Sequence, residues 1–78
     1  MPHQKYLILL GQRIKEIRQQ KEMSQMDVSA ESYIEIATLS RLEAGKANPT
    51  LLTLLKLSKA LDVHISEFFY NHPDFPED

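Results

Sequence analysis

The chain has 78 residues, which suits one small domain, and 42% of them are hydrophobic, too many for a largely disordered chain. The absence of cysteine excludes a disulfide framework and thiolate zinc sites. The formal net charge is −2, but three of the 11 acidic residues lie in the segment 73–78, so residues 1–72 carry nine basic and eight acidic side chains. Composition therefore neither predicts nor excludes a nucleic-acid partner.

The sequence predicts neither a membrane-spanning segment nor a signal peptide. No apolar run approaches the roughly 18 residues that cross a bilayer, and the short run at residues 6–10 lacks the basic leader and the cleavage site of a signal peptide. We therefore expect a soluble, cytoplasmic protein without a membrane partner.

The first predicted helix covers about residues 6–21. Its apolar residues recur at spacings of three or four, as on one face of a helix: Leu7, Leu10, Ile14 and Ile17. Arg13 belongs to the opposite, polar face, which we expect to be solvated. Gly11 interrupts this helix at a cost of about 1 kcal/mol relative to Ala, which predicts a close backbone contact there.

The second predicted helix covers about residues 25–31. Ser24 precedes it, and Asp27 follows Ser24 by three residues. The Ser24 hydroxyl can accept from the Asp27 amide while the Asp27 carboxylate accepts from the Ser24 amide, in a relative of the capping box. This pair predicts the start of the helix.

A third helix is predicted over about residues 35–44 after a turn of only three residues, 32–34. Its apolar residues repeat every third position: Ile36, Leu39 and Leu42. Gly45 is well placed to end the helix in the left-handed conformation. Two short helices joined by so short a turn are typical of a helix-turn-helix.

Two more helices are predicted, over about residues 51–61 and 65–70, with Thr50 and His64 as their N-caps. The helix over 51–61 has leucine on nearly every side, which indicates a central helix or one shared with a partner. The expected fold class is therefore all-α, with five helices and no strand.

Several short segments stand in order along this pattern: LGQRIKEIR at 10–18, MSQ at 23–25, LSRLEAGK at 39–46, NPT at 48–50, LLKLSKAL at 54–61 and VHISEFF at 63–69. With these segments the chain resembles the Cro/repressor-type, or XRE-like, helix-turn-helix family. The resemblance covers about residues 10–69. It implies a compact five-helix lambda-repressor-like DNA-binding domain at residues 1–72, followed by a short acidic tail at 73–78.

The resemblance also implies roles for individual residues, with helix 35–43 lying in the DNA major groove. The implied DNA-binding residues are Gln25, Glu35, Ile36, Ala37, Ser40, Arg41, Lys46 and Asn48. Arg41 is suited to guanine, while Ile36 and Ala37 offer apolar surface for thymine methyl groups. We expect the phosphate contacts from Gln25 at the start of a helix and from the loop after the third helix. Arg18 and Glu43 are implied to form a structural ion pair.

Three positions depart from the family pattern. Tyr33 stands in the turn where glycine is usual, which predicts either a left-handed tyrosine at a cost of roughly 1–2 kcal/mol or a turn of another shape. Glu35 replaces the usual serine or threonine cap of the third helix. Ile36 and Ala37 replace polar side chains, and an exposed Ile36 could instead pack on Tyr33 or on a protein partner.

We interpret the chain as a sequence-specific DNA-binding transcriptional regulator, a repressor in its simplest form, that acts as a homodimer on operator DNA. A restriction–modification controller belongs to this class. The alternative is a protein-interaction module or an antitoxin that uses the same fold, with DNA binding weak or secondary. No nucleophile–base pair and no ligand spacing among His3, His64 and His72 is present, so we expect no enzyme activity, no metal site and no cofactor.

The homodimer prediction depends on surplus apolar surface. One small core cannot bury every apolar residue of helix 51–61 together with the aromatic residues near the C-terminus, which are Phe68, Phe69, Tyr70 and Phe75. A contiguous apolar patch that stays exposed marks an interface. We therefore expect two copies to pair through this end of the domain.

Overall fold

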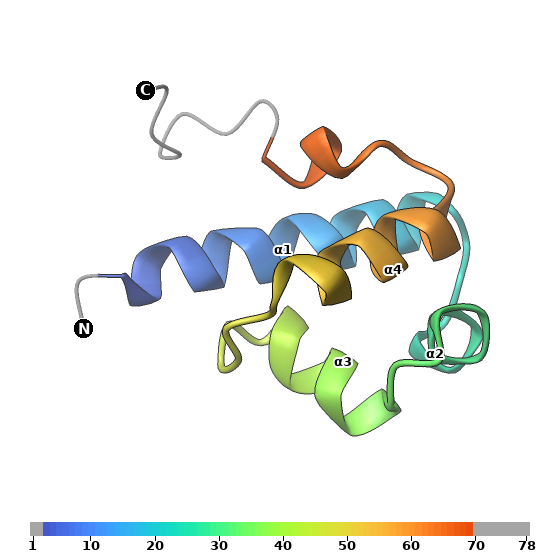
Figure 1. Cartoon of the computed structure of the whole chain (residues 1–78), viewed down its shortest axis with the longest axis horizontal. Coiled ribbons are helices and arrows are strands. Elements are labelled where there is room, and N and C mark those ends of the chain that lie inside the picture. The colour runs from blue at the N-terminus through green and yellow to red at the C-terminus, as the bar shows by residue number, and fades with distance from the viewer. Residues whose placement is uncertain (1–2, 70–78) are drawn as a thin grey trace.

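The computed structural model describes residues 3–69 of the chain. It contains the α-helices α1 (Gln4–Gln20), α2 (Gln25–Ser32), α3 (Ile36–Glu43) and α4 (Leu51–Leu61), followed by a short 3-10 helix, η1 (Ile65–Phe69) (Figure 1). This stretch contains no strand, so the predicted all-α class is confirmed. The predicted tail 73–78 and the preceding residues 70–72 lie outside the described residues. No helix within 3–69 is long and apolar enough to cross a membrane.

The long helix α1 is the element around which the others are arranged (Figure 1). It packs against α3 and against η1, which lie on opposite sides of it, while α2 packs against α3 and α4. The helices α2 and α3 follow each other across the turn at Tyr33, so the predicted helix-turn-helix is present. This arrangement leaves one side of α3 free of any other helix.

A single apolar core joins all five elements. Its buried members are Leu10, Ile14, Ile17, Val28, Ile34, Leu39, Leu42, Leu54, Leu57, Leu61 and Phe68. Phe68 of η1 is completely buried, which corrects the expectation that it contributes to an exposed aromatic patch. A short segment at the end of the domain thus closes the core.

The helix boundaries differ from the predicted ones by at most two residues, with α4 at the predicted 51–61, and the fifth element differs in type. Residues 65–69 form a 3-10 helix, which corrects the prediction of an α-helix at 65–70. The amide of Glu67 donates to the carbonyl of His64, three residues earlier, at 2.9 Å. An element this short favours the tighter i→i+3 pattern. His64 still acts as a cap, because its Nδ1 accepts from the amide of Ser66 at 3.2 Å.

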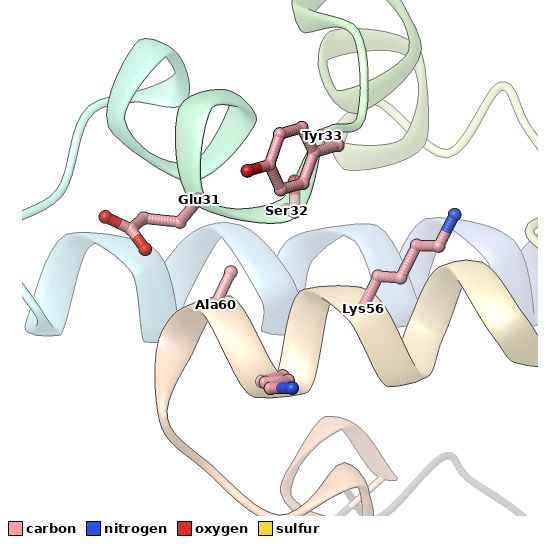
Figure 2. Close-up of a pocket in the computed structure, with 6 residues that line it drawn as sticks. Glu31, Ser32, Tyr33, Lys56 and Ala60 are labelled. Carbon is pink, nitrogen blue, oxygen red and sulfur yellow. The ribbon is translucent and has the colours of Figure 1, made fainter.

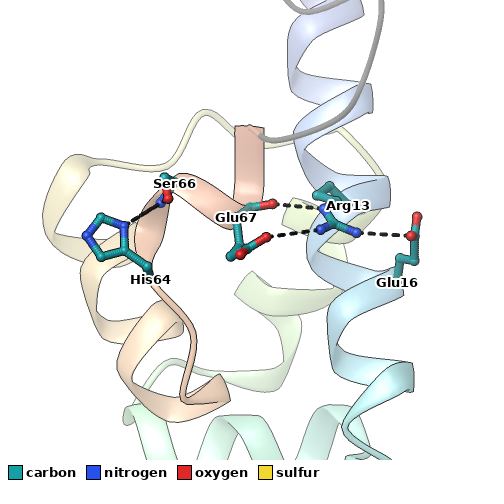
Figure 3. A network of polar contacts seen from close by, with 5 residues as sticks. All are labelled: Arg13, Glu16, His64, Ser66 and Glu67. Carbon is teal, nitrogen blue, oxygen red and sulfur yellow. Dashed lines mark hydrogen bonds and ion pairs between the residues drawn. The ribbon is translucent and has the colours of Figure 1, made fainter.

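Arg13 fastens η1 to α1 (Figure 3). Its Nε donates to the carbonyl of Glu67 at 2.8 Å, and its two terminal nitrogens lie 3.0 Å from the carboxylate of Glu16 and 3.5 Å from that of Glu67. Arg13 is therefore half-buried, which corrects its predicted place on a solvated face. A guanidinium has enough donors to serve a carbonyl and two carboxylates together.

Candidate nucleic-acid interface

The start of α2 is shaped by the predicted capping box, which is confirmed. The Asp27 amide donates to Ser24 Oγ at 3.0 Å, and the Ser24 amide donates to Asp27 Oδ2 at 2.9 Å. These bonds from Ser24 lower the pKa of the Asp27 carboxyl, and the backbone bond has the larger effect. The first amides of a helix have no partner inside it, so those of Gln25 and Met26 remain available to an anion.

The turn between α2 and α3 depends on Tyr33, which adopts the left-handed conformation with φ of 62°. Of the two possibilities left open by the sequence, the structure therefore has the left-handed tyrosine. Ile34 follows it into the core; its amide donates to Ser32 Oγ at 3.2 Å, and its carbonyl accepts from Ser29 Oγ. The turn thus satisfies its backbone with two serines while Tyr33 is left 91% exposed.

One face of α3 is open to solvent along its whole length. Leu39 and Leu42 are buried on the other face. The exposed residues include every position predicted for base contact: Glu35, Ile36, Ala37, Ser40 and Arg41. Glu35 is the N-cap residue, but its side chain makes no capping bond, so its carboxylate is free. Arg41 makes no ion pair within residues 3–69.

Thr38 is a member of this face that the sequence interpretation missed. It is exposed and lies three residues before Arg41, so the two side chains are neighbours on the helix surface. The helical spacing from Arg41 was the signal that could have found it. A threonine hydroxyl adds a hydrogen-bonding group beside the guanidinium.

The loop after α3 begins with a complete Schellman turn. Gly45 has φ of +75°, its amide donates to the Leu42 carbonyl at 3.0 Å, and the Lys46 amide donates to the Arg41 carbonyl at 2.9 Å. This ending, which confirms the predicted role of Gly45, leaves Lys46 and Asn48 exposed just beyond α3. The two residues predicted to contact phosphate therefore follow directly on the end of α3 that carries Arg41.

The first turn of α1 lies beside this loop, a relationship that the sequence did not reveal. His3, Gln4 and Leu7 line a hollow of about 400 Å³ together with Gly45, Lys46 and Asn48. The loop and α1 are so close that a Cβ atom at Gly45 would stand only 2.7 Å from Ile8 of α1. His3 and Gln4 thus join the surface formed by the loop, although no local pattern at residues 3–4 indicates it.

Arg18 and Glu43 form an ion pair that links α1 to the end of α3. Arg18 Nε donates to Glu43 Oε2 at 2.7 Å and Arg18 Nη2 donates to Oε1 at 2.9 Å. The side chain of Glu43 is only 3% exposed. The hydrogen bond to Glu43 raises the pKa of the Arg18 guanidinium above its usual value. A third Arg18 nitrogen donates to the carbonyl of Met23 at 3.0 Å, just before α2.

Gln25, predicted to touch phosphate, is joined to this pair. It is the first residue of α2, and its Nε2 donates to Glu43 Oε1 at 3.1 Å. One of the two N–H groups of its side-chain amide is therefore already used. The backbone amide of Gln25 and the remaining N–H group are the donors left for a phosphate.

A second hollow lies between α4 and the end of α2 (Figure 2). It measures about 690 Å³ and is lined by Glu31, Ser32, Tyr33, Lys56, Lys59 and Ala60. Tyr33 and Lys56 extend from opposite walls in Figure 2. No cluster of three or more His, Cys, Asp or Glu residues that could hold a metal ion lines this hollow or occurs elsewhere in residues 3–69.

Comparison with known proteins places this geometry in a family. The helix-turn-helix family model matches residues 14–68. The transcriptional regulator PuuR of Escherichia coli (strain K12) is 37% identical over 68 residues, which are 87% of this chain and 36% of PuuR. The control protein C.MunI of Mycoplasma sp. is 33% identical over 63 residues, which are 80% of this chain and 85% of that protein.

A solved structure agrees with this match. The restriction-modification controller protein C.AhdI from Aeromonas hydrophila has a TM-score of 0.82 and 34% identity, over 83% of this chain and 98% of that one. The present chain therefore spans most of the length of two control proteins but about a third of PuuR. The chain belongs to the helix-turn-helix family, as its resemblance to the Cro/repressor type implied.

Proposed function

We propose that this protein is a DNA-binding transcriptional regulator that places α3 in the major groove of double-stranded DNA. The observation that carries the proposal is the open face of α3, which combines a free arginine with exposed small and hydroxyl side chains. The eight residues of α3 span about 12 Å, close to the width of the major groove. The helix is thus short enough to enter the groove with its whole exposed face.

The side chains of this face suit different base edges. The Arg41 guanidinium matches O6 and N7 of guanine with two hydrogen bonds, and the free Glu35 carboxylate matches the amino group of cytosine. Ile36 and Ala37 fit thymine methyl groups, and Ser40 adds a weakly selective hydroxyl. Sequence preference therefore comes chiefly from the two charged residues.

Contacts with the DNA backbone would come from either side of α3. The free amides at the start of α2, including that of Gln25, suit one phosphate, since helix N-termini attract anions. Lys46 and Asn48 are exposed beyond the other end of α3 and suit a second phosphate. Such contacts orient the protein without reading sequence.

We further propose that the protein acts as a homodimer through α4. Leu51, Leu52 and Leu55 are 66%, 61% and 44% exposed and lie next to one another on this helix. An apolar surface of this kind is typical of a subunit interface. Two-fold pairing would place two copies of α3 about 34 Å apart, which is one turn of the duplex. A dimer bound to its operator would then repress transcription by blocking polymerase. Of the aromatic residues expected to contribute, Tyr70 and Phe75 lie outside the described residues.

A narrower form of the proposal is control of a restriction–modification system. It is supported by the likeness to C.MunI and C.AhdI over most of their lengths. The second candidate function, a protein-interaction module or antitoxin, is favoured by one observation. Tyr33 is 91% exposed and Ile36 is 41% exposed at the start of α3, where a protein partner would also find apolar surface.

Selection of bound duplexes from a random oligonucleotide pool tests the proposed function. A regulator enriches a two-fold symmetric sequence, and its affinity for that duplex falls steeply as the salt concentration rises because phosphate contacts release counterions. Absence of enrichment, with no binding at low salt, contradicts the proposal and favours the interaction module. Sedimentation equilibrium at micromolar concentration tests the dimer, since a mass that stays at the 9.0 kDa of one chain excludes it.

A further inference from the structure

Two side chains from two helices, Arg18 of α1 and Gln25 of α2, converge on the carboxylate of Glu43 in α3. Glu43 Oε1 accepts from Arg18 Nη2 at 2.9 Å and from Gln25 Nε2 at 3.1 Å, while Oε2 accepts from Arg18 Nε at 2.7 Å. The residues Gln25 and Glu43 are 18 positions apart in the chain. The Glu43 side chain is 3% exposed, so water competes little for these bonds.

We propose that Glu43 is a positioning residue for DNA binding: held by Arg18, it fixes the side-chain amide of Gln25 in the orientation that meets a phosphate. This inference rests on the proposed DNA-binding function. It gives the Arg18–Glu43 pair a second role besides joining α1 to α3.

The chemistry of an amide explains how the carboxylate sets this orientation. A glutamine amide has an oxygen on one side and two N–H groups on the other. A carboxylate repels the oxygen and accepts from nitrogen, so Glu43 selects the rotamer in which nitrogen points inward. The two N–H groups diverge by about 120° in the amide plane, so the second cannot reach the same oxygen and points away from the pair.

The second N–H group then lies on the same residue as a free backbone amide. Gln25 is the first residue of α2, and the capping hydroxyl of Ser24 satisfies only the amide of Asp27. A phosphate at this helix start would meet the backbone amide and an already oriented side-chain donor. An unheld glutamine would lose three freely rotating bonds on contact, so its prior ordering strengthens binding.

The test compares the effect of Gln25→Ala in two backgrounds. One is the parent protein. The other carries Arg18→Met with Glu43→Leu, which replaces the ion pair by apolar side chains of similar size and leaves no uncompensated buried charge. Affinity is measured for the duplex selected by the parent, at a temperature where circular dichroism shows every variant folded.

In the parent, we expect Gln25→Ala to weaken DNA binding by about two- to tenfold, the effect of one ordered side chain. In the apolar-pair background we expect the same substitution to have almost no effect, because Gln25 is no longer held. A matched control removes the link between α1 and η1, by Arg13→Met with Glu67→Gln, since neither residue forms a hydrogen bond or ion pair with α2 or α3. There the effect of Gln25→Ala should equal that in the parent.

An equal effect of Gln25→Ala in all three backgrounds overturns the inference and leaves the proposed function standing. A parent that binds no duplex overturns both.

A second measurement needs no substitution at the ion pair. In the NMR spectrum of the free parent, the two Nε2 protons of Gln25 should differ in shift by clearly more than those of the exposed Gln12, because one proton of Gln25 is bonded to a carboxylate. Addition of DNA should shift the other proton more. A separation no larger than that of Gln12 in the free protein would show that Gln25 is not held, and would overturn the inference whether or not the apolar-pair variant folds.

Discussion

Gly11 of α1 lies directly against the backbone of Glu43 at the end of α3: a Cβ atom at Gly11 would stand 2.8 Å from the Glu43 carbonyl oxygen. It would come closer still to the carbonyl oxygen of Leu42. These are backbone atoms, which cannot turn aside as a side chain can. The two helices cross at this distance only because residue 11 has no side chain, and this crossing brings Arg18 within reach of Glu43.

We therefore expect Gly11→Ala to lower the free energy of unfolding by about 1–3 kcal/mol, the usual cost of overpacking. The decrease should appear although alanine is the better helix former by about 1 kcal/mol. Urea denaturation measures it, with the exposed neighbouring substitution Gln12→Ala as the control. A Gly11→Ala midpoint equal to or above that of the parent would contradict the close contact.

Glu43→Ala should lower the free energy of unfolding by about 3–5 kcal/mol, because it leaves the Arg18 guanidinium without its buried partner. A thermal melt should show this as a fall of roughly 4–8 °C per kcal/mol for a domain of this size. The control is Glu16→Ala, which removes an exposed carboxylate paired with Arg13 and should cost less than about 1 kcal/mol. Parent-like melting of Glu43→Ala would refute the structural role of the pair.

Tyr33→Gly should raise the free energy of unfolding by about 1 kcal/mol, since glycine adopts the left-handed conformation without steric cost. The substitution removes little buried surface, because the side chain is 91% exposed. Tyr33→Ala is the matched control, as it removes the ring but keeps the Cβ atom that causes the strain. The strain argument fails if the glycine variant is no more stable than the alanine variant in chemical denaturation.

The stability of the capping box should depend on pH. Bonds from Ser24 lower the pKa of Asp27 from its ordinary value of 3.8, so folding favours the charged carboxylate. Its stabilisation is complete above that ordinary value and disappears as the pH falls through the lowered pKa. The difference in melting temperature between the parent and Asp27→Ala should thus be constant near neutral pH and shrink in strong acid. Ser24→Ala keeps the backbone amide that has the larger effect on the pKa of Asp27, so its difference from the parent should change less with pH. A difference between the parent and Asp27→Ala that is independent of pH would rule out this linkage.

Arg41→Ala should weaken binding to the selected duplex by about 1–3 kcal/mol and relax the preference at one base position in each half-site. Lys46→Ala is the comparison, because a side chain that binds only phosphate supports binding to every sequence equally. Its removal should weaken binding to all duplexes alike and reduce the salt dependence by about one counterion. Fluorescence anisotropy with duplexes varied at single positions separates the two effects. If a folded Arg41→Ala protein keeps both affinity and preference, the base contact is assigned wrongly.

Local features of the fold are predictable because they depend on near neighbours in the chain. The spacing of Leu39 and Leu42 determines which face of α3 is buried, and Ser24, Thr50 and Gly45 mark helix ends through bonds to residues at most four positions away. The family match also follows from such short segments. The predicted base-contact positions follow in turn, since helical spacing alone decides which side chains of α3 share a face.

Only the tertiary structure decided which polar side chains meet across the fold. Arg13 lies on the polar face of α1, which predicts a solvated side chain, yet it bonds to Glu67, 54 residues later. The position of Gln25 at a helix start predicts a free amide, yet Glu43 uses one of its N–H groups. Phe68 is buried while Leu52 is exposed, although both are strongly apolar. Each outcome depends on which helix faces lie together, and residues within one turn of a position carry no information about a partner 18 or 54 positions away.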